Sequence, residues 1–171
     1  NSIVSDGERR LAQRAFLTEA ALAGRLQHPH IVSIQDAVSE GDENYIVMEY
    51  ASGGTLEKFC SHDSLLPVDR LVELMFMACL ALNHAYQQGV IHCDIKPANL
   101  LLSKNNQLKI SDFGAAQYVA AAHTVLSGVG SPLYMSPEQI EDKRLNNQTD
   151  IYSLGVVMYQ LLTGRPPFHG S

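Results

Sequence analysis

Residues 90–102 of the chain read VIHCDIKPANLLL: an apolar run, a short polar loop and a second apolar run. The loop contains a carboxylate (Asp94), an ammonium group (Lys96) and an amide (Asn99). A carboxylate can accept a hydroxyl proton, a cation can neutralise phosphate charge and an amide oxygen can hold Mg²⁺, so this set suits phosphoryl transfer. A polar loop between two buried strands would have the same composition, and this stretch alone leaves both interpretations open.

Three further motifs follow the loop in order. A short strand-like segment at 108–110 leads to Asp-Phe-Gly at 112–114, and GSPLYMSPE (130–138) and DIYSLG (150–155) come later. Together with the H-x-D-x-x-x-x-N spacing of the polar loop, these motifs resemble those of the eukaryotic-type protein kinases. The residues of these motifs are similar to those of the Ser/Thr kinases of bacteria, and the resemblance covers the chain from about Phe16 onward.

The resemblance implies an α+β fold, the bilobal fold of the protein kinases, represented in part. Residues 1–51 would belong to the small lobe, with helix C, strands 4 and 5 and the hinge. Residues 52–171 would belong to the large lobe, with the catalytic loop, the activation segment and the buried helix F. We expect the small lobe to lack its first strands and the large lobe its last helices, as in a chain truncated at both ends.

Hydrophobic periodicity and turn residues predict elements that agree with this fold. The expected helices are 8–26, 67–88 and 151–162, and the expected strands are 31–38, 44–50, 100–102 and 107–110. The helix at 151–162 is apolar nearly all round, which predicts that it is buried. The resemblance further implies that Asp150 caps this helix and braces the backbone of the catalytic loop.

The implied reaction is transfer of the ATP γ-phosphoryl group to a Ser or Thr hydroxyl of a protein substrate. Asp94 would orient the hydroxyl and take its proton, and Lys96 would neutralise charge on the migrating group. Asn99 and Asp112 would hold Mg²⁺. The Lys-Pro pair in the loop resembles Ser/Thr kinases rather than Tyr kinases. Ser131 fits the same group, as the hydroxyl that bridges the lysine and the catalytic carboxylate.

Four residues would contact the nucleotide if the resemblance holds. Glu19 would pair with the strand lysine that grips the α- and β-phosphates, although most helical glutamates are simply solvated surface residues. Met48 would lie behind the adenine at the gatekeeper position. The backbone of Glu49 and Ala51 would bond the adenine edge. A buried strand end is the alternative interpretation of these last three residues.

The motifs also contain residues that we expect not to act chemically. His92 and Phe113 resemble packing residues of the family rather than acid–base groups. Cys93 stands where many kinases have an arginine that pairs with a phosphate on the activation segment, and a thiol cannot form that pair. The resulting hypothesis is that activity does not depend on phosphorylation of Thr124 or Ser127 by this route. A quiet, partly buried thiol is the simplest interpretation of Cys93, and a redox role is the alternative.

Bulk composition limits the classes of function. The 171 residues are 46% hydrophobic and 18% charged, as in a globular domain. The net charge of −6 argues against nucleic-acid partners and anionic membranes. The three cysteines lack C-x-x-C spacing and favour a reducing, cytoplasmic location, and no zinc site is expected. No apolar run is long enough to predict a membrane segment.

Two features of the kinase pattern are missing from the sequence. No G-x-G-x-x-G motif can be drawn, and no lysine precedes Lys58, so Glu19 has no upstream lysine partner within the 171 residues. We therefore expect the chain itself to be inactive as a fragment of an active kinase. The alternatives are a pseudokinase and a scaffold module that binds nucleotide or a partner protein.

Overall fold

The computed structural model describes residues 24–40, 43–113, 116–118 and 131–168. The predictions for Glu19, Thr124 and Ser127 fall outside these ranges, as does nearly all of the helix expected over 8–26. No helix within the described ranges is both long and apolar enough to cross a bilayer.

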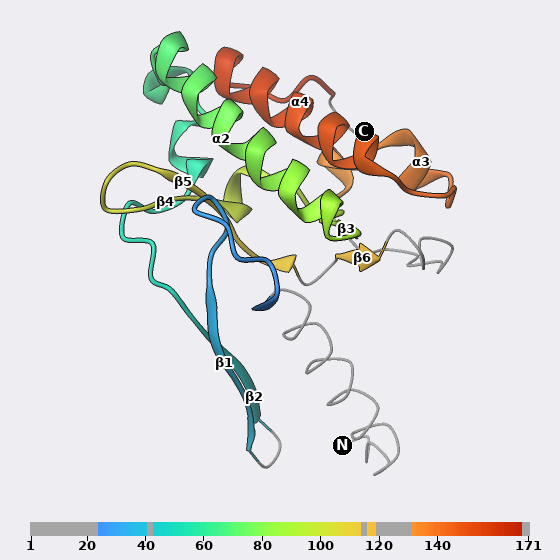
Figure 1. The fold of residues 1–171 in the computed structure, drawn as a ribbon. Coiled ribbons are helices and arrows are strands. Elements are labelled where there is room, and N and C mark those ends of the chain that lie inside the picture. The colour runs from blue at the N-terminus through green and yellow to red at the C-terminus, as the bar shows by residue number, and fades with distance from the viewer. Residues whose placement is uncertain (1–23, 41–42, 114–115, 119–130, 169–171) are drawn as a thin grey trace, which may run out of the picture.

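Two strands form an antiparallel ribbon, β1 (Ile34–Glu40) and β2 (Glu43–Met48). Figure 1 shows this ribbon projecting away from the two long helices. The prediction of two strands is confirmed, although β1 begins three residues later than the expected start at 31. The start is later because Ile31 forms a bridge with Ile110 in another part of the fold, and the N–H of Val32 donates to the Ile110 carbonyl at 2.8 Å.

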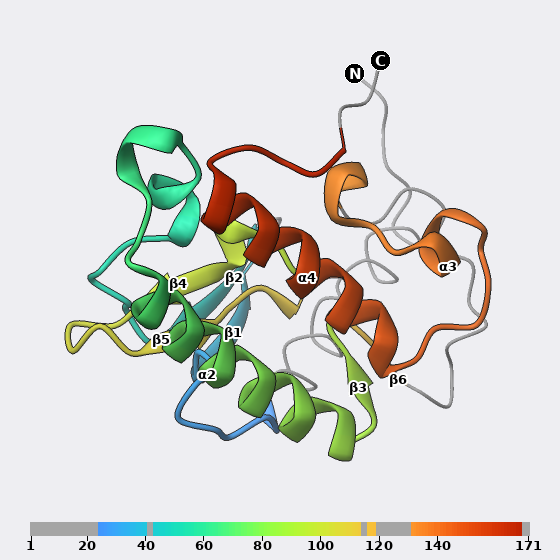
Figure 2. The same ribbon diagram turned by 90° about the horizontal axis from the view of Figure 1, so that it is seen from above.

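The two long helices, α2 (Val68–Gln87) and α4 (Asn147–Thr163), lie side by side. Figure 2 shows the pair from above, with the strands β4 (Leu100–Leu102) and β5 (Leu108–Ile110) beneath. The apolar face of α2 is buried, as its helical spacing predicts: Leu71, Leu74, Met75, Ala78, Ala81, Leu82 and Ala85. Gly89 ends this helix with a left-handed φ of 77°, which glycine adopts without steric cost.

The predicted hairpin is confirmed: β4 and β5 pair antiparallel, with Leu100 opposite Ile110 and Leu102 opposite Leu108. Alternate residues of these strands are fully buried in the same apolar core as α2. A second short pair joins β3 (Val90–Ile91) to β6 (Gln117–Tyr118). The polar loop at 92–99 therefore lies between β3 and β4, and both of its ends are fixed by strands.

Two expectations about the last helix are wrong. The N-cap of α4 is Asn146, whose side chain accepts the Gln148 N–H at 2.7 Å, and Asp150 lies inside the helix. The helix is also buried on one face only, since Ile151 and Tyr159 are 51% and 42% exposed. Apolar composition predicts that a helix has core-facing residues, but it does not show how many neighbours cover it. The short helix α3 (Pro137–Ile140) precedes it and begins with a capping box at Ser136.

Candidate active site

A buried carboxylate on α4 accepts hydrogen bonds from the backbone of the polar loop. Asp150 is 4% exposed, and its two oxygens accept the N–H groups of His92 and Cys93, each at 2.9 Å. Burial raises the pKa of Asp150, while the His92 ring and the N–H donors of His92 and Cys93 act in the opposite direction. The expectation that Asp150 braces the loop backbone is confirmed.

Cys93 has an unusual backbone conformation, with a φ of 67°. A non-glycine residue in the left-handed region costs about 1–3 kcal/mol unless its surroundings hold it there. Here the Cys93 N–H is bonded to Asp150, and its carbonyl accepts the Gln139 side-chain amide at 2.8 Å. Cys93 is 4% exposed, so its thiol is more deeply buried than the partly buried thiol expected from the sequence.

His92 uses both ring nitrogens within the fold. Its Nδ1 accepts the Asp94 N–H at 3.2 Å, so Nε2 carries the proton and donates to the Ser111 carbonyl at 3.0 Å. The ring is fully buried and its centroid lies 4.6 Å from that of Phe113. The structure thus places His92 and Phe113 in contact as packing residues, in agreement with the sequence interpretation.

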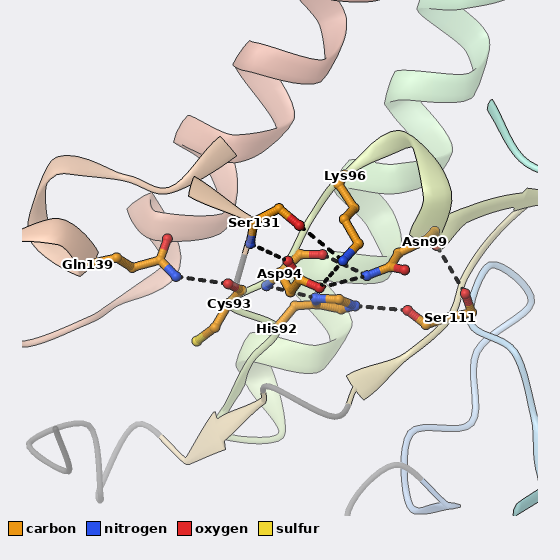
Figure 3. Close-up of polar contacts among 8 residues, drawn as sticks. All are labelled: His92, Cys93, Asp94, Lys96, Asn99, Ser111, Ser131 and Gln139. Carbon is orange, nitrogen blue, oxygen red and sulfur yellow. Dashed lines mark hydrogen bonds and ion pairs between the residues drawn. The ribbon is translucent and has the colours of Figure 1, made fainter. Parts of the chain in front are cut away.

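Asp94 lies at the centre of a compact polar cluster (Figure 3). Its Oδ2 is 2.7 Å from the Lys96 Nζ and accepts the Asn99 side-chain amide at 3.2 Å. Its Oδ1 accepts the Ser131 backbone N–H at 3.0 Å. The Lys96 Nζ also donates to the Ser131 hydroxyl at 3.1 Å. Ser131 therefore links the lysine and the carboxylate, but it reaches the carboxylate through its N–H rather than its hydroxyl.

The contacts within this cluster fix its charged groups, and one edge of the cluster remains exposed to solvent. The side chains of Asp94 and Lys96 are 11% and 25% exposed, so a reacting group can reach both from solvent. Partial burial strengthens the attraction between them relative to an exposed pair. A carboxylate fixed by three donors beside an ammonium group is suited to align a hydroxyl and to accept its proton.

Asn99 and Asp112 are the candidate metal ligands. The Asn99 amide nitrogen donates to the Asp94 carbonyl at 2.8 Å, and its Oδ1 forms no hydrogen bond with any other described residue. Asp112 is exposed and follows Ser111, whose N–H donates to the Asn99 carbonyl at 2.9 Å. Amide and carboxylate oxygens are the donors that Mg²⁺ prefers, so this pair fits the ion. Within the described ranges, His, Cys, Asp and Glu form no three-residue metal cluster.

The predicted hinge lies at a second place, after the end of β2. Met48 is 45% exposed, so for this residue the alternative of a buried strand end is wrong. The Glu49 N–H donates to the Ser33 carbonyl at 2.9 Å. Neither the Glu49 carbonyl nor the Ala51 N–H is bonded to another described residue, which leaves one acceptor and one donor for a ligand.

Sequence reasoning missed two functional-site neighbours, Gln139 and Lys109. Gln139 completes the capping box of α3 and also donates to the Cys93 carbonyl; the S-x-x-Q pattern was visible, but its second contact was not. Lys109 forms an ion pair with Glu49, N to O 2.7 Å. Its only sequence signal is a charged residue between two buried ones in the LKI strand.

Comparison with known proteins assigns the family. A protein kinase domain model matches residues 2–171. The serine/threonine-protein kinase PknB of Mycobacterium leprae is 41% identical over 162 residues, which cover 91% of this chain and 26% of that protein. PrkC of Bacillus subtilis is 41% identical over 160 residues, 92% of this chain and 24% of its own length. The chain thus spans about a quarter of these relatives. With its polar loop, Asp-Phe-Gly motif and α+β fold, the chain belongs to the protein kinase domain family.

Proposed function

We propose that the protein containing this chain is a Ser/Thr protein kinase that transfers the γ-phosphoryl group of ATP to a Ser or Thr hydroxyl of a protein. The observation that supports this most directly is the Asp94 cluster, in which one carboxylate contacts Lys96, Asn99 and Ser131 within 3.2 Å. The relatives named as Ser/Thr kinases in Mycobacterium and Bacillus support the same reaction.

The roles follow from the contacts. Asp94 orients the substrate hydroxyl and takes its proton, while Lys96 neutralises charge on the transferred group. Asn99 and Asp112 hold Mg²⁺, which screens repulsion between the nucleotide oxygens and the nucleophile. Ser131 keeps the lysine beside the carboxylate. In this proposal the Ser131 hydroxyl is the feature of the site that fits a Ser/Thr kinase.

The adenine binds at the hinge, between the two lobes that we place at 1–51 and 52–171. The Glu49 carbonyl accepts the adenine amino group and the Ala51 N–H donates to the ring, with Met48 behind it. Glu19 pairs with the lysine that grips the α- and β-phosphates in this proposal. The absence of disulfides among the described residues and the net charge of −6 favour a cytoplasmic enzyme without nucleic-acid partners.

The test uses the full product of the gene that encodes this chain, assayed for phosphate transfer from ATP to Ser-, Thr- and Tyr-containing peptides. The Asp94→Asn variant keeps the shape of the side chain but removes the base, so kcat should fall about 10²- to 10⁴-fold. The control is Asp63→Asn, since Asp63 is exposed and lies in a short turn far along the chain from the loop.

Three results would contradict the proposal or one of its assigned roles. Transfer mainly to tyrosine would show the wrong acceptor class. ATP binding by the wild-type protein without any transfer would instead favour the pseudokinase alternative, a nucleotide-binding scaffold. Full activity of Asp94→Asn would show that Asp94 is not the base, while the family assignment would stand.

A further inference from the structure

The Glu49 side chain is partly covered at the hinge, where its carboxylate meets Ser33 and Lys109. Its Oε1 lies 2.7 Å from the Lys109 Nζ, while its Oε2 accepts the Ser33 N–H at 3.1 Å and the Ser33 hydroxyl at 3.0 Å. The Glu49 and Lys109 side chains are only 26% and 15% exposed. This ion pair is therefore sheltered, unlike an ordinary surface pair.

The contacts use nearly every polar group of Glu49. Its N–H is taken by the Ser33 carbonyl and both carboxylate oxygens are taken by Ser33 and Lys109. Burial alone would raise the pKa of Glu49, but the hydrogen bonds from Lys109 and Ser33 outweigh it and lower the pKa. Glu49 is thus an anion whose backbone N–H and side-chain carboxylate are both held by hydrogen bonds. The backbone carbonyl, the proposed adenine acceptor, is the one remaining polar group.

Lys109 connects this anchor to the strand that leads to the metal ligands. It lies in β5, and Asp112 follows that strand by two residues. The partner strand β4 begins directly after Asn99, and its Leu102 carbonyl accepts the Gly53 N–H at 2.7 Å. The hinge is consequently tied to both strands of the hairpin from which the catalytic loop and the Asp-Phe-Gly motif extend.

We infer that Lys109 is a positioning residue for the nucleotide: through its ion pair with Glu49 it fixes the adenine-binding carbonyl relative to the strand that carries Asp112. This inference rests on the proposed function, since it assumes that the hinge binds adenine. Lys109 itself does not touch the nucleotide. Its loss therefore weakens binding of the adenine end and leaves the phosphate end unchanged.

The strand can accept a neutral residue at this position. Leu108 and Ile110 on either side are fully buried and face the core, so Lys109 points to the opposite face. Lys109→Met keeps an unbranched side chain of similar length without the charge. The matched control is Lys104→Met, because Lys104 is exposed in the turn of the same hairpin.

The experiment measures binding of adenosine and of tripolyphosphate with Mg²⁺, separately, to the full gene product by calorimetry. In Lys109→Met the adenosine Kd should rise about three- to tenfold, while the tripolyphosphate Kd stays within about twofold. Glu49→Gln should have a similar effect, and the double variant should be no worse than the weaker single variant. Lys109→Arg, which keeps the charge, should retain adenosine affinity within about twofold.

Three results would overturn the inference: no adenosine binding by the wild type, an unchanged adenosine Kd in both Lys109→Met and Glu49→Gln, or equal loss of both probes. The melting temperature of each variant shows whether it folds. If Lys109→Met does not fold, the adenosine Kd values of Glu49→Gln and Lys109→Arg test the inference instead. The result is separable from the proposed function. A protein that binds adenosine without transferring phosphate refutes the kinase proposal while the binding data still test Lys109.

Discussion

The catalytic loop (92–99) and the hinge (48–51) differ in how the fold holds them. The loop rests on the buried carboxylate of Asp150, and its polar groups bond both to one another and to Ser111, Ser131 and Gln139 outside the loop. The hinge follows a two-stranded ribbon that projects from the core (Figure 1) and that carries exposed residues such as Tyr45 and Val47. Its main polar anchor is the side chain of Glu49, held by Ser33 and Lys109.

The difference concerns how the fold positions the two halves of the proposed phosphoryl-transfer site. Groups that act on the transferred phosphate need fixed geometry, and here a helix, a strand and a turn fix them together. The proposed adenine side offers the backbone groups of Glu49 and Ala51, and its position depends on a few polar contacts that tie the ribbon to the hairpin. Changes beneath the loop should therefore have larger effects on stability than changes around the hinge.

The largest expected effect is from Asp150→Ala. The change leaves two buried N–H groups, those of His92 and Cys93, without their acceptors, and it releases the left-handed conformation of Cys93. We expect the free energy of unfolding to fall by about 2–5 kcal/mol, measured by urea denaturation. The control is Asp63→Ala, which removes an exposed carboxylate. A loss of less than about 1 kcal/mol in Asp150→Ala would show that the loop does not depend on this support.

An intermediate effect is expected at the junction between hinge and hairpin. A Cβ on Gly53 would lie 2.6 Å from the Leu102 carbonyl oxygen, where backbone must move. Gly53→Ala should therefore lower the free energy of unfolding by about 1–3 kcal/mol. The contrasting change is Gly155→Ala in α4, where nothing lies within 4 Å and alanine favours the helix by about 0.5–1 kcal/mol. If both variants have the same free energy of unfolding, the contact between Gly53 and the Leu102 carbonyl is not tight.

Local patterns were sufficient for the elements around the loop. The helical spacing of α2 and the two apolar runs of the hairpin have periods that a sequence displays directly. The cluster of Asp94, Lys96 and Asn99 was also predictable, because eight residues between two strands must lie close together. These are short-range features, so one sequence contains the information needed to expect them.

Long-range features were harder to predict. The resemblance to kinases implies that Asp150 caps α4, and only the structure shows that Asn146 caps this helix while Asp150 is buried against the loop. The pairing of Glu49 with Lys109 joins segments distant in the sequence and has no local pattern. The exposed side of α4, with Ile151, likewise depends on what packs nearby rather than on its own composition.

The smallest expected effect is a pH dependence at the segment beside β5, where three histidines meet. The His28 ring stacks on His84 of α2 with centroids 5.1 Å apart, and it lies 5.5 Å from His30, whose Nδ1 is 3.0 Å from the Leu108 carbonyl oxygen. Burial lowers the pKa of His28, and the charges of His84, His30 and Lys109 lower it further. The charge of Lys109 is in turn balanced by Glu49.

The sign follows from proton binding. Because the folded pKa of His28 lies below its ordinary value of 6.5, the unfolded chain binds the proton more readily. Stability from this group is therefore present above pH 6.5 and is lost as the pH falls towards the lowered value. His28→Gln should reduce the difference in Tm between neutral and acidic buffer by about 1–2 °C, since one half-buried group contributes little. His62→Gln, at an exposed site, should leave that difference as in the wild type. If His28→Gln leaves it unchanged too, the cluster does not couple protonation to folding.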